Sequence, residues 1–144
     1  MKCSFRILSI AVITVILASN VTYARFAHNS RDLIIGKDMF TKGHNKEAIE
    51  HLTRAIEHKP KLAPAVLANA FFDRAIAERA IGKNKAAKAD FRKSIDVDPT
   101  PINGLAYRKR GFAKSAVGDP EGAKSDFKMA VSLGDISARK WIRD

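Results

Sequence analysis

A spaced pattern of small, apolar and turn-forming residues occurs three times along the chain. Each copy begins at a glycine or alanine and has an alanine 12 residues later, a large apolar residue 4 further on, and a small residue 3 beyond that. A glycine also follows each starting position by seven residues. The three aligned sets are Gly36, Ala48, Leu52, Ala55 and Pro60; Ala75, Ala87, Phe91, Ser94 and Pro99; and Gly111, Ala123, Phe127, Ala130 and Asp135. This self-similarity predicts a stack of like units.

Apolar residues within each copy recur at helical spacing. Each copy is therefore predicted to be two helices joined by a tight turn at Gly43, Gly82 or Gly118. No alternating run of β-branched and polar residues predicts a strand after residue 24.

Polar residues and prolines are predicted to mark the helix ends. The residues expected to cap helix starts are Asn45, Asn84, Thr100 and Asp119, the last two followed by proline. Pro60 and Pro99 are expected to stop the second helices of the first two copies. The copies are 39 and 36 residues apart, which predicts a lengthened helix over 65–81 and a longer connection over 100–104.

The small residue that opens each copy predicts a close crossing of its two helices. Gly36, Ala75 and Gly111 are expected to face Ala48, Ala87 and Ala123, since a larger side chain would separate the helices. The large apolar residues expected to fill the space between successive hairpins are Leu52, Phe91 and Phe127. A short helix over 136–143, containing Trp141, is expected to close the stack.

These landmarks resemble those of the tetratricopeptide repeats, which are helix–turn–helix units of 34 residues. The resemblance covers about residues 29–137, as copies over 29–62, 68–101 and 104–137. It implies an all-α fold: a right-handed α-solenoid of three helix–turn–helix hairpins with a C-terminal capping helix. The first helices depart from the family pattern, with Asp32, Phe71 and Tyr107 in the place of its Trp, and Met39, Glu78 and Lys114 in the place of its Tyr.

Residues 1–24 have the pattern of a secretory signal peptide. Lys2 and Arg6 precede a twelve-residue apolar run over 7–18, and small residues near Ala24 predict cleavage after it. The run is shorter than the roughly 20 residues that a membrane-spanning helix needs. The alternatives to a cleaved signal peptide are an uncleaved anchor and a buried helix of the folded domain. The mature domain, 25–144, is expected to be periplasmic in a Gram-negative bacterium, or secreted, with no stable membrane span. The only cysteine, Cys3, would be removed, which excludes disulfides and thiol catalysis from the mature chain.

No motif typical of catalysis or of cofactor binding occurs. The four histidines are His28, His44, His51 and His58. The last three are each seven residues apart, which is about 10 Å along a helix and too far for two of these histidines to bind one metal ion. The histidines are therefore interpreted as solvated surface residues. A triad of Ser30, His51 and Asp32 can be drawn, but nothing in the sequence fixes its geometry. No catalytic residue, cofactor or metal is predicted.

The chain is strongly basic, with 26 Lys and Arg against 15 Asp and Glu and a net charge of +11. The densest basic groups are Lys83-Lys85-Lys88, Arg108-Lys109-Arg110 and Arg139-Lys140-Arg143. Most of these charged residues are interpreted as lying on the solvent-exposed faces of amphipathic helices. Nucleic-acid binding is disfavoured because the aromatic residues sit mainly at core positions of the repeat. A basic adaptor for an anionic polymer or a membrane surface is the alternative function.

The resemblance implies that the first helices line the inner surface of the stack, where a protein or peptide partner would bind. The residues expected to line this basic groove are Lys37, Asp73, Ile76, Arg79, Arg108, Lys109 and Phe112. Ile76 and Phe112 are equally well interpreted as core. Chaperone-binding relatives hold a C-terminal carboxylate with a clamp of basic and Asn residues. Leu33, Asp73 and Leu105 occupy three of those places, which disfavours that specialised function and leaves binding of another protein, within envelope assembly, as the leading one.

Overall fold

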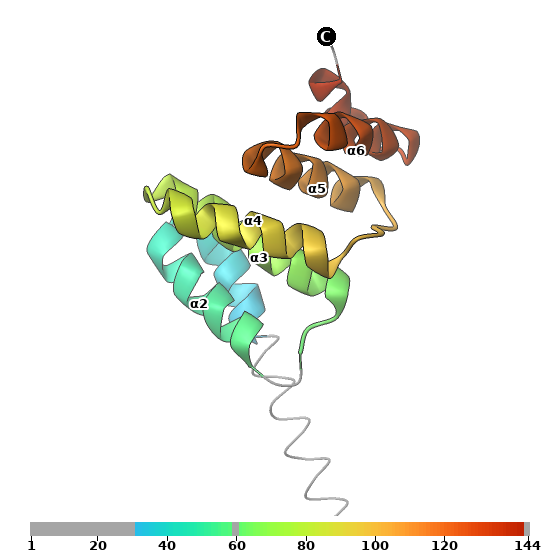
Figure 1. Ribbon diagram of the computed structural model, residues 1–144. Helices are drawn as coiled ribbons and strands as arrows, with labels where there is room; N and C mark the ends of the chain where they lie inside the picture. Colours follow the sequence, from blue (N-terminus) through green and yellow to red (C-terminus); the bar gives the residue numbers. More distant parts are fainter. Residues whose placement is uncertain (1–30, 59–60, 143–144) are drawn as a thin grey trace, which may run out of the picture.

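The computed structural model describes residues 31–58 and 61–142, and in this part every regular element is a helix (Figure 1). The elements are a helix over 31–41, α2 (Asn45–Glu57), α3 (Pro64–Ala80), α4 (Asn84–Val97), α5 (Gly104–Val117), α6 (Pro120–Ser132) and the 3-10 helix η1 (Ile136–Trp141). The predicted all-α fold is confirmed. The predicted signal peptide, residues 1–24, lies outside the described residues, as do His28, Ser30, Pro60 and Arg143.

The helices pack as successive hairpins that stack one on the next (Figure 1). α3 packs along α4 and α5 along α6, while α2 with α3, and α4 with α5, join one hairpin to its neighbour. η1 packs on α6 and covers part of the last hairpin. The predicted order of three hairpins and a closing element is confirmed, and so is the long first helix of the second copy, which spans 17 residues in α3.

The turns between paired helices lie at the predicted glycines. Gly43, Gly82 and Gly118 have φ of +79°, +80° and +100°, in the left-handed region that side chains other than glycine's rarely adopt. An added Cβ would meet no atom within 4 Å at any of the three. Backbone conformation, rather than crowding, therefore requires glycine there.

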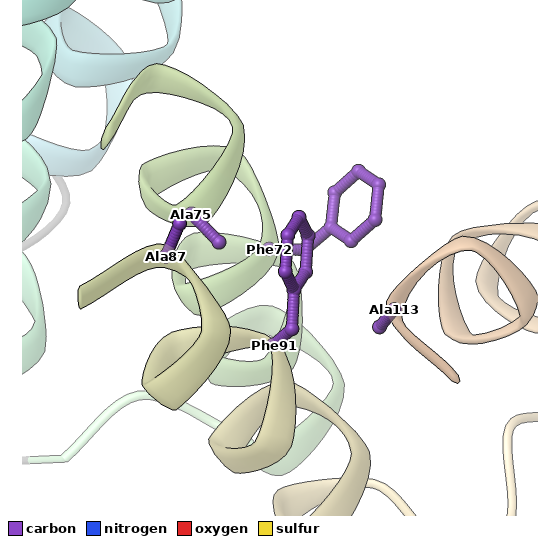
Figure 2. Close-up of a cluster of buried hydrophobic side chains, with 5 residues drawn as sticks. All are labelled: Phe72, Ala75, Ala87, Phe91 and Ala113. Atoms are coloured by element: carbon purple, nitrogen blue, oxygen red, sulfur yellow. The ribbon is translucent and has the colours of Figure 1, made fainter. Parts of the chain in front are cut away.

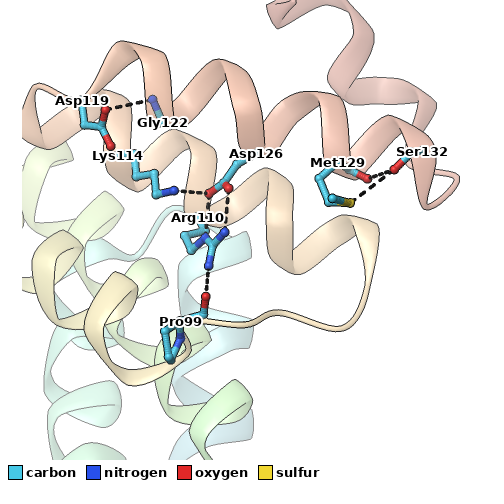
Figure 3. Close-up of polar contacts among 8 residues, drawn as sticks. All are labelled: Pro99, Arg110, Lys114, Asp119, Gly122, Asp126, Met129 and Ser132. Carbon is cyan, nitrogen blue, oxygen red and sulfur yellow. Dashed lines mark hydrogen bonds and ion pairs between the residues drawn. The ribbon is translucent and has the colours of Figure 1, made fainter.

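The second helices of the first two copies start differently from the prediction. Asp119 does cap α6, where its carboxylate accepts a hydrogen bond from the Gly122 amide at 2.9 Å (Figure 3). The prediction for Asn45 and Asn84 was wrong. They are the first residues of α2 and α4, and the N-cap positions belong to His44 and Lys83, whose side chains make no capping bond.

Two further boundaries differ from the prediction. α5 begins at Gly104 rather than after Thr100, because Asn103 caps it by accepting a hydrogen bond from the Ala106 amide at 2.9 Å. The closing element, predicted as a short helix over 136–143, is a 3-10 helix of six residues, Ile136–Trp141. Short terminal segments commonly take this tighter form, since few backbone hydrogen bonds would be gained by an α-helix of this length.

Gly36 and Gly111 allow the paired helices to approach closely, but the residues they face differ from the predicted alanines. A Cβ on Gly36 would lie 2.9 Å from Leu52 Cγ, and one on Gly111 would lie 2.8 Å from Phe127 Cε1. The atoms nearest these glycines therefore belong to the large residue one turn beyond the predicted alanine. A helical side chain leans toward the N-terminus of its helix, so Leu52 and Phe127 cover the level of that alanine.

The middle of the stack is held by one apolar cluster from three helices (Figure 2). Ala75 and Ala87 lie side by side at the crossing of α3 and α4, as predicted. The rings of Phe72 and Phe91 meet edge to face, with centroids 5.7 Å apart. Ala113 of α5 packs against them from the next hairpin. Phe91 thus joins two hairpins, in the role predicted for it.

Candidate functional site

An open groove of about 400 Å³ is lined by the first helices of all three copies. Its lining residues are Phe40 from the helix over 31–41, Phe72, Ile76 and Arg79 from α3, Phe91 from α4, and Phe112, Ser115 and Ala116 from α5. Ile76 and Phe112 are half-buried and rest on the cluster of Phe72 and Phe91. The groove therefore has an apolar floor that is built on the core itself.

Arg79 is the one charged residue of the groove lining. Its side chain is exposed, and its guanidinium carbon lies 5.7 Å from the centroid of the Phe91 ring. It has no acidic partner among the described residues. A cation held over an aromatic face and left without a counter-ion can pair with an acidic group that enters the groove.

The seven predicted groove residues fall into three groups in the structure. Ile76, Arg79 and Phe112 line the groove, and Lys37 is exposed on the helix over 31–41 outside its lining. The other three form internal ion pairs: Lys109 Nζ lies 2.9 Å from a carboxylate oxygen of Asp73, and Arg108 Nε lies 2.6 Å from one of Asp135. Asp73 is buried rather than exposed, because it meets Lys109 where α3 and α5 pack.

Two buried ion pairs repeat from the second copy to the third. Arg74 donates to both carboxylate oxygens of Asp90 at 2.6 and 3.0 Å, and Arg110 donates to both of Asp126 at 2.7 and 2.6 Å. Lys114 Nζ lies 3.2 Å from Asp126 as well (Figure 3). Hydrogen bonding to Asp126 raises the pKa of Arg110, although burial opposes it.

Each arginine of these pairs also bonds to the preceding hairpin. Arg74 donates to the Thr53 hydroxyl of α2 at 2.9 Å, and Arg110 donates to the carbonyl of Pro99 (Figure 3). This role was not predicted from the sequence. The available signal was an Arg and an Asp 16 residues apart at the same repeat positions in two copies.

In the first copy, a histidine takes the place of the repeated aspartate. His51 Nδ1 lies 2.8 Å from Asp32 Oδ1, and Arg54 Nε donates to the same oxygen at 3.2 Å. Burial alone would raise the pKa of Asp32, but the bonds with His51 and Arg54 outweigh it and hold the pKa below its usual value. The interpretation of His51 as a solvated surface residue was therefore wrong.

Residues 31–58 and 61–142 contain no group of three His, Cys, Asp or Glu side chains that could hold a metal ion. Nor does any helix of this part of the chain have the length and apolarity needed to cross a bilayer.

Glu78 is a buried carboxylate whose Oε2 atom has no hydrogen-bond partner among the residues that the structure describes. It occupies the repeat position of Lys114, which pairs with Asp126, so here an acid stands where the next copy has a base. Burial and the nearby Asp90 raise its pKa. Because ionised Glu78 is disfavoured in the folded state, its penalty is present above the raised pKa and disappears as pH falls toward the unfolded value.

We expect Glu78→Gln to raise the free energy of unfolding at neutral pH by about 1 kcal/mol, since it removes a buried charge. Urea unfolding followed by circular dichroism would measure this gain. The gain should shrink as pH is lowered from neutral toward 4.5, the usual pKa of the side chain. Glu121→Gln is the control, because Glu121 is exposed on α6. Loss of stability in Glu78→Gln would contradict this account.

One of the three copies matches a model of a known protein family. Residues 68–101 match the tetratricopeptide repeat family. This segment coincides with the second of the three copies found in the sequence, and it contains α3 after its first turn together with all of α4. No curated protein matches the chain.

Solved tetratricopeptide-repeat domains share the fold of the chain. The first such domain of Spaghetti (RPAP3), bound to the HSP90 peptide SRMEEVD, has a TM-score of 0.60 and 23% identity over 81% of this chain and 89% of that one. The second domain of human RPAP3, in complex with the HSP70 peptide SGPTIEEVD, has a TM-score of 0.55 and 27% identity over 84% and 94%. The Sgt2 domain from Aspergillus fumigatus has a TM-score of 0.57 and 21% identity over 79% and 74%. The stacked hairpins therefore form a tetratricopeptide-type α-solenoid.

Proposed function

We propose that the chain is a non-catalytic scaffold that binds a segment of another protein in the groove between α3 and α5. The observation that carries this proposal is the groove itself, which combines an apolar floor with one guanidinium that has no described counter-ion. Its volume of about 400 Å³ suits a few side chains of a peptide or one face of a helix.

The groove chemistry defines the segment that would bind. An aliphatic or aromatic side chain would rest on Ile76 and Phe112, and a neighbouring Asp or Glu would reach Arg79. The apolar contact would supply most of the affinity, and the charge would set register and specificity. The same site offers nothing to a basic segment.

Two of the structural relatives are in complex with peptides that end in EEVD, but we propose that this chain does not select such an end. Lys109 is already neutralised by the buried Asp73, so it is not available to a terminal carboxylate. Leu33 and Leu105 cannot supply the charge at two other clamp places. An internal segment with an apolar side chain beside an acid fits the groove better.

Selection of random peptides displayed against the full chain would test this function. We expect enriched peptides to carry an apolar residue next to Asp or Glu, and Arg79→Glu to weaken them about tenfold, since it replaces attraction by like-charge repulsion. Lys37→Glu is the matched control, because Lys37 is exposed on a first helix outside the groove lining. Selected peptides that bind Arg79→Glu and Ile76→Ala as well as the wild type would refute the proposal.

We further propose that the chain is exported, with residues 1–24 acting as a cleaved signal peptide, and that it works in the bacterial periplasm or outside the cell. Mass spectrometry of the protein from cell fractions tests this directly. A mature N-terminus at Arg25 in the periplasmic or secreted fraction is expected. An intact chain confined to the cytoplasm would overturn the export proposal without affecting the groove.

A further inference from the structure

Two dense basic groups of the sequence differ in whether their side chains form ion pairs in the structure. Arg108, Lys109 and Arg110 are all engaged in ion pairs with aspartates. By contrast, four cations that lie just before α4 or within its first nine residues are exposed and make no ion pair with any described residue. We name these the α4 basic patch: Lys83, Lys85, Lys88 and Arg92. The patch is therefore one part of the basic surface where several neighbouring cations are available to a polyanion.

Three of the four side chains form a narrow stripe along α4, and Lys83 lies just before the helix at its N-cap. At 3.6 residues per turn, Lys85, Lys88 and Arg92 fall within an arc of about 60°, and Lys83 to Arg92 extends about 14 Å. The stripe faces away from the buried Ala87 and Phe91. Beside it lies an open depression of about 580 Å³ lined by Gly82, Lys83, Asn84, Lys85, Ala86 and Ala89. The small residues of this depression allow a chain to approach the helix closely between the lysines.

We propose that the α4 basic patch binds a linear acidic polysaccharide. The charge around the patch favours a narrow ligand over a flat one. The outward faces of the other second helices carry exposed glutamates: Glu47, Glu50 and Glu57 on α2, and Glu121 on α6. An anionic bilayer pressed against this side would meet those carboxylates. A single polymer chain that runs from Lys85 to Arg92 avoids them and stops short of the exposed Asp96 of α4.

The groups available for contact also favour a polysaccharide over the other linear polyanions. The one aromatic residue within 83–92, Phe91, is buried, so no ring is available to stack on nucleic-acid bases. The backbone of α4 is bonded within the helix, and the depression is lined by small residues, so an acidic peptide finds neither strand pairing nor side-chain pockets. The three lysines act there as point charges, and the planar guanidinium of Arg92 can bind a sulfate or carboxylate group of the chain through two hydrogen bonds.

This inference is independent of the groove. The lining residues of the groove and the members of the α4 basic patch do not overlap. A scaffold with both sites would hold a partner protein beside an anionic polymer. Either site can therefore fail its test while the other stands.

The test is calorimetric titration of the full chain with heparin, a sulfated polysaccharide, at low and at physiological salt. Lys85→Gln/Arg92→Gln is compared with Lys46→Gln/Lys128→Gln, which removes two exposed cations at the same two repeat positions in α2 and α6. We expect the patch variant to bind heparin about tenfold more weakly and the control to change by less than about twofold. Binding of the wild type should also weaken steeply with salt.

Three results would overturn the inference. Equal losses in the two double variants would mean that net charge alone drives binding. Patch-dependent binding of single-stranded DNA, polyglutamate or phosphatidylglycerol vesicles that is tighter than that of heparin would assign the patch to another ligand. Absence of salt-sensitive heparin binding would leave the patch without this role. Circular dichroism of each variant verifies that the exposed substitutions leave the fold unchanged.

Discussion

Replacing Asp126 with alanine is expected to lower the free energy of unfolding by about 3–5 kcal/mol, because it leaves a buried cation without its partner. Arg110 and Lys114 both pair with this carboxylate, and their side chains are only 14% and 20% exposed. Arg110 also ties the last hairpin to Pro99. Urea unfolding of the full chain, followed by far-ultraviolet circular dichroism, measures the loss.

Two controls separate the buried pair from an ordinary surface pair. Asp38→Ala removes an acid that pairs with Lys42 at 2.7 Å, but these side chains are 47% and 56% exposed. Asp38→Ala should lower the free energy of unfolding by less than about 1 kcal/mol. Replacing all three members, as Arg110→Met/Lys114→Met/Asp126→Leu, should destabilise less than Asp126→Ala, since no charge of the cluster is left buried alone. An Asp126→Ala protein as stable as Asp38→Ala would contradict the structural role of the pair.

Phe91→Ala is expected to lower the free energy of unfolding by about 3–5 kcal/mol, because it opens a cavity at the centre of the stack. Phe91 is 2% exposed and contacts residues of two hairpins, including Phe72 and Ala113 (Figure 2). It also lines the groove, so binding of selected peptides should fall together with stability. Thermal and urea unfolding measure the first effect, and calorimetry with a selected peptide measures the second.

Ile102→Ala is the control for this substitution, because Ile102 is 86% exposed and supports no cluster. A change within about 0.5 kcal/mol is expected. If Phe91→Ala cost no more than Ile102→Ala, the hairpins would not be joined through this ring.

The features that the sequence predicted correctly are those with a local cause. Gly43, Gly82 and Gly118 are needed by their own backbone conformation, so their recurrence located all three turns. The same recurrence predicted the hairpins, and helical spacing predicted Phe91 as an inward residue. Asp119 caps its helix because its own carboxylate reaches the Gly122 amide, whereas Thr100, which is also followed by proline, does not start a helix.

The features that the sequence missed depend on which residues meet in space. Lys109 and Arg108 looked like free cations because their acids, Asp73 and Asp135, are 36 and 27 residues away. Asp32 and His51 were likewise unremarkable until the first hairpin brought them together. Charge counts alone therefore favoured a basic groove. Among the described residues, the groove lining is mostly apolar with Arg79 as its one charged residue, and the α4 basic patch lies outside it.

The central claim is that the first helices of the stacked hairpins form a binding groove around Ile76. Nuclear magnetic resonance of the methyl groups of the full chain, titrated with a selected peptide, tests it most directly. The account predicts that the Ile76 methyl signals shift and that Arg79→Glu suppresses the shift. Shifts confined to the outward faces of α2, α4 and α6, with Ile76 unchanged at saturating peptide, would contradict it.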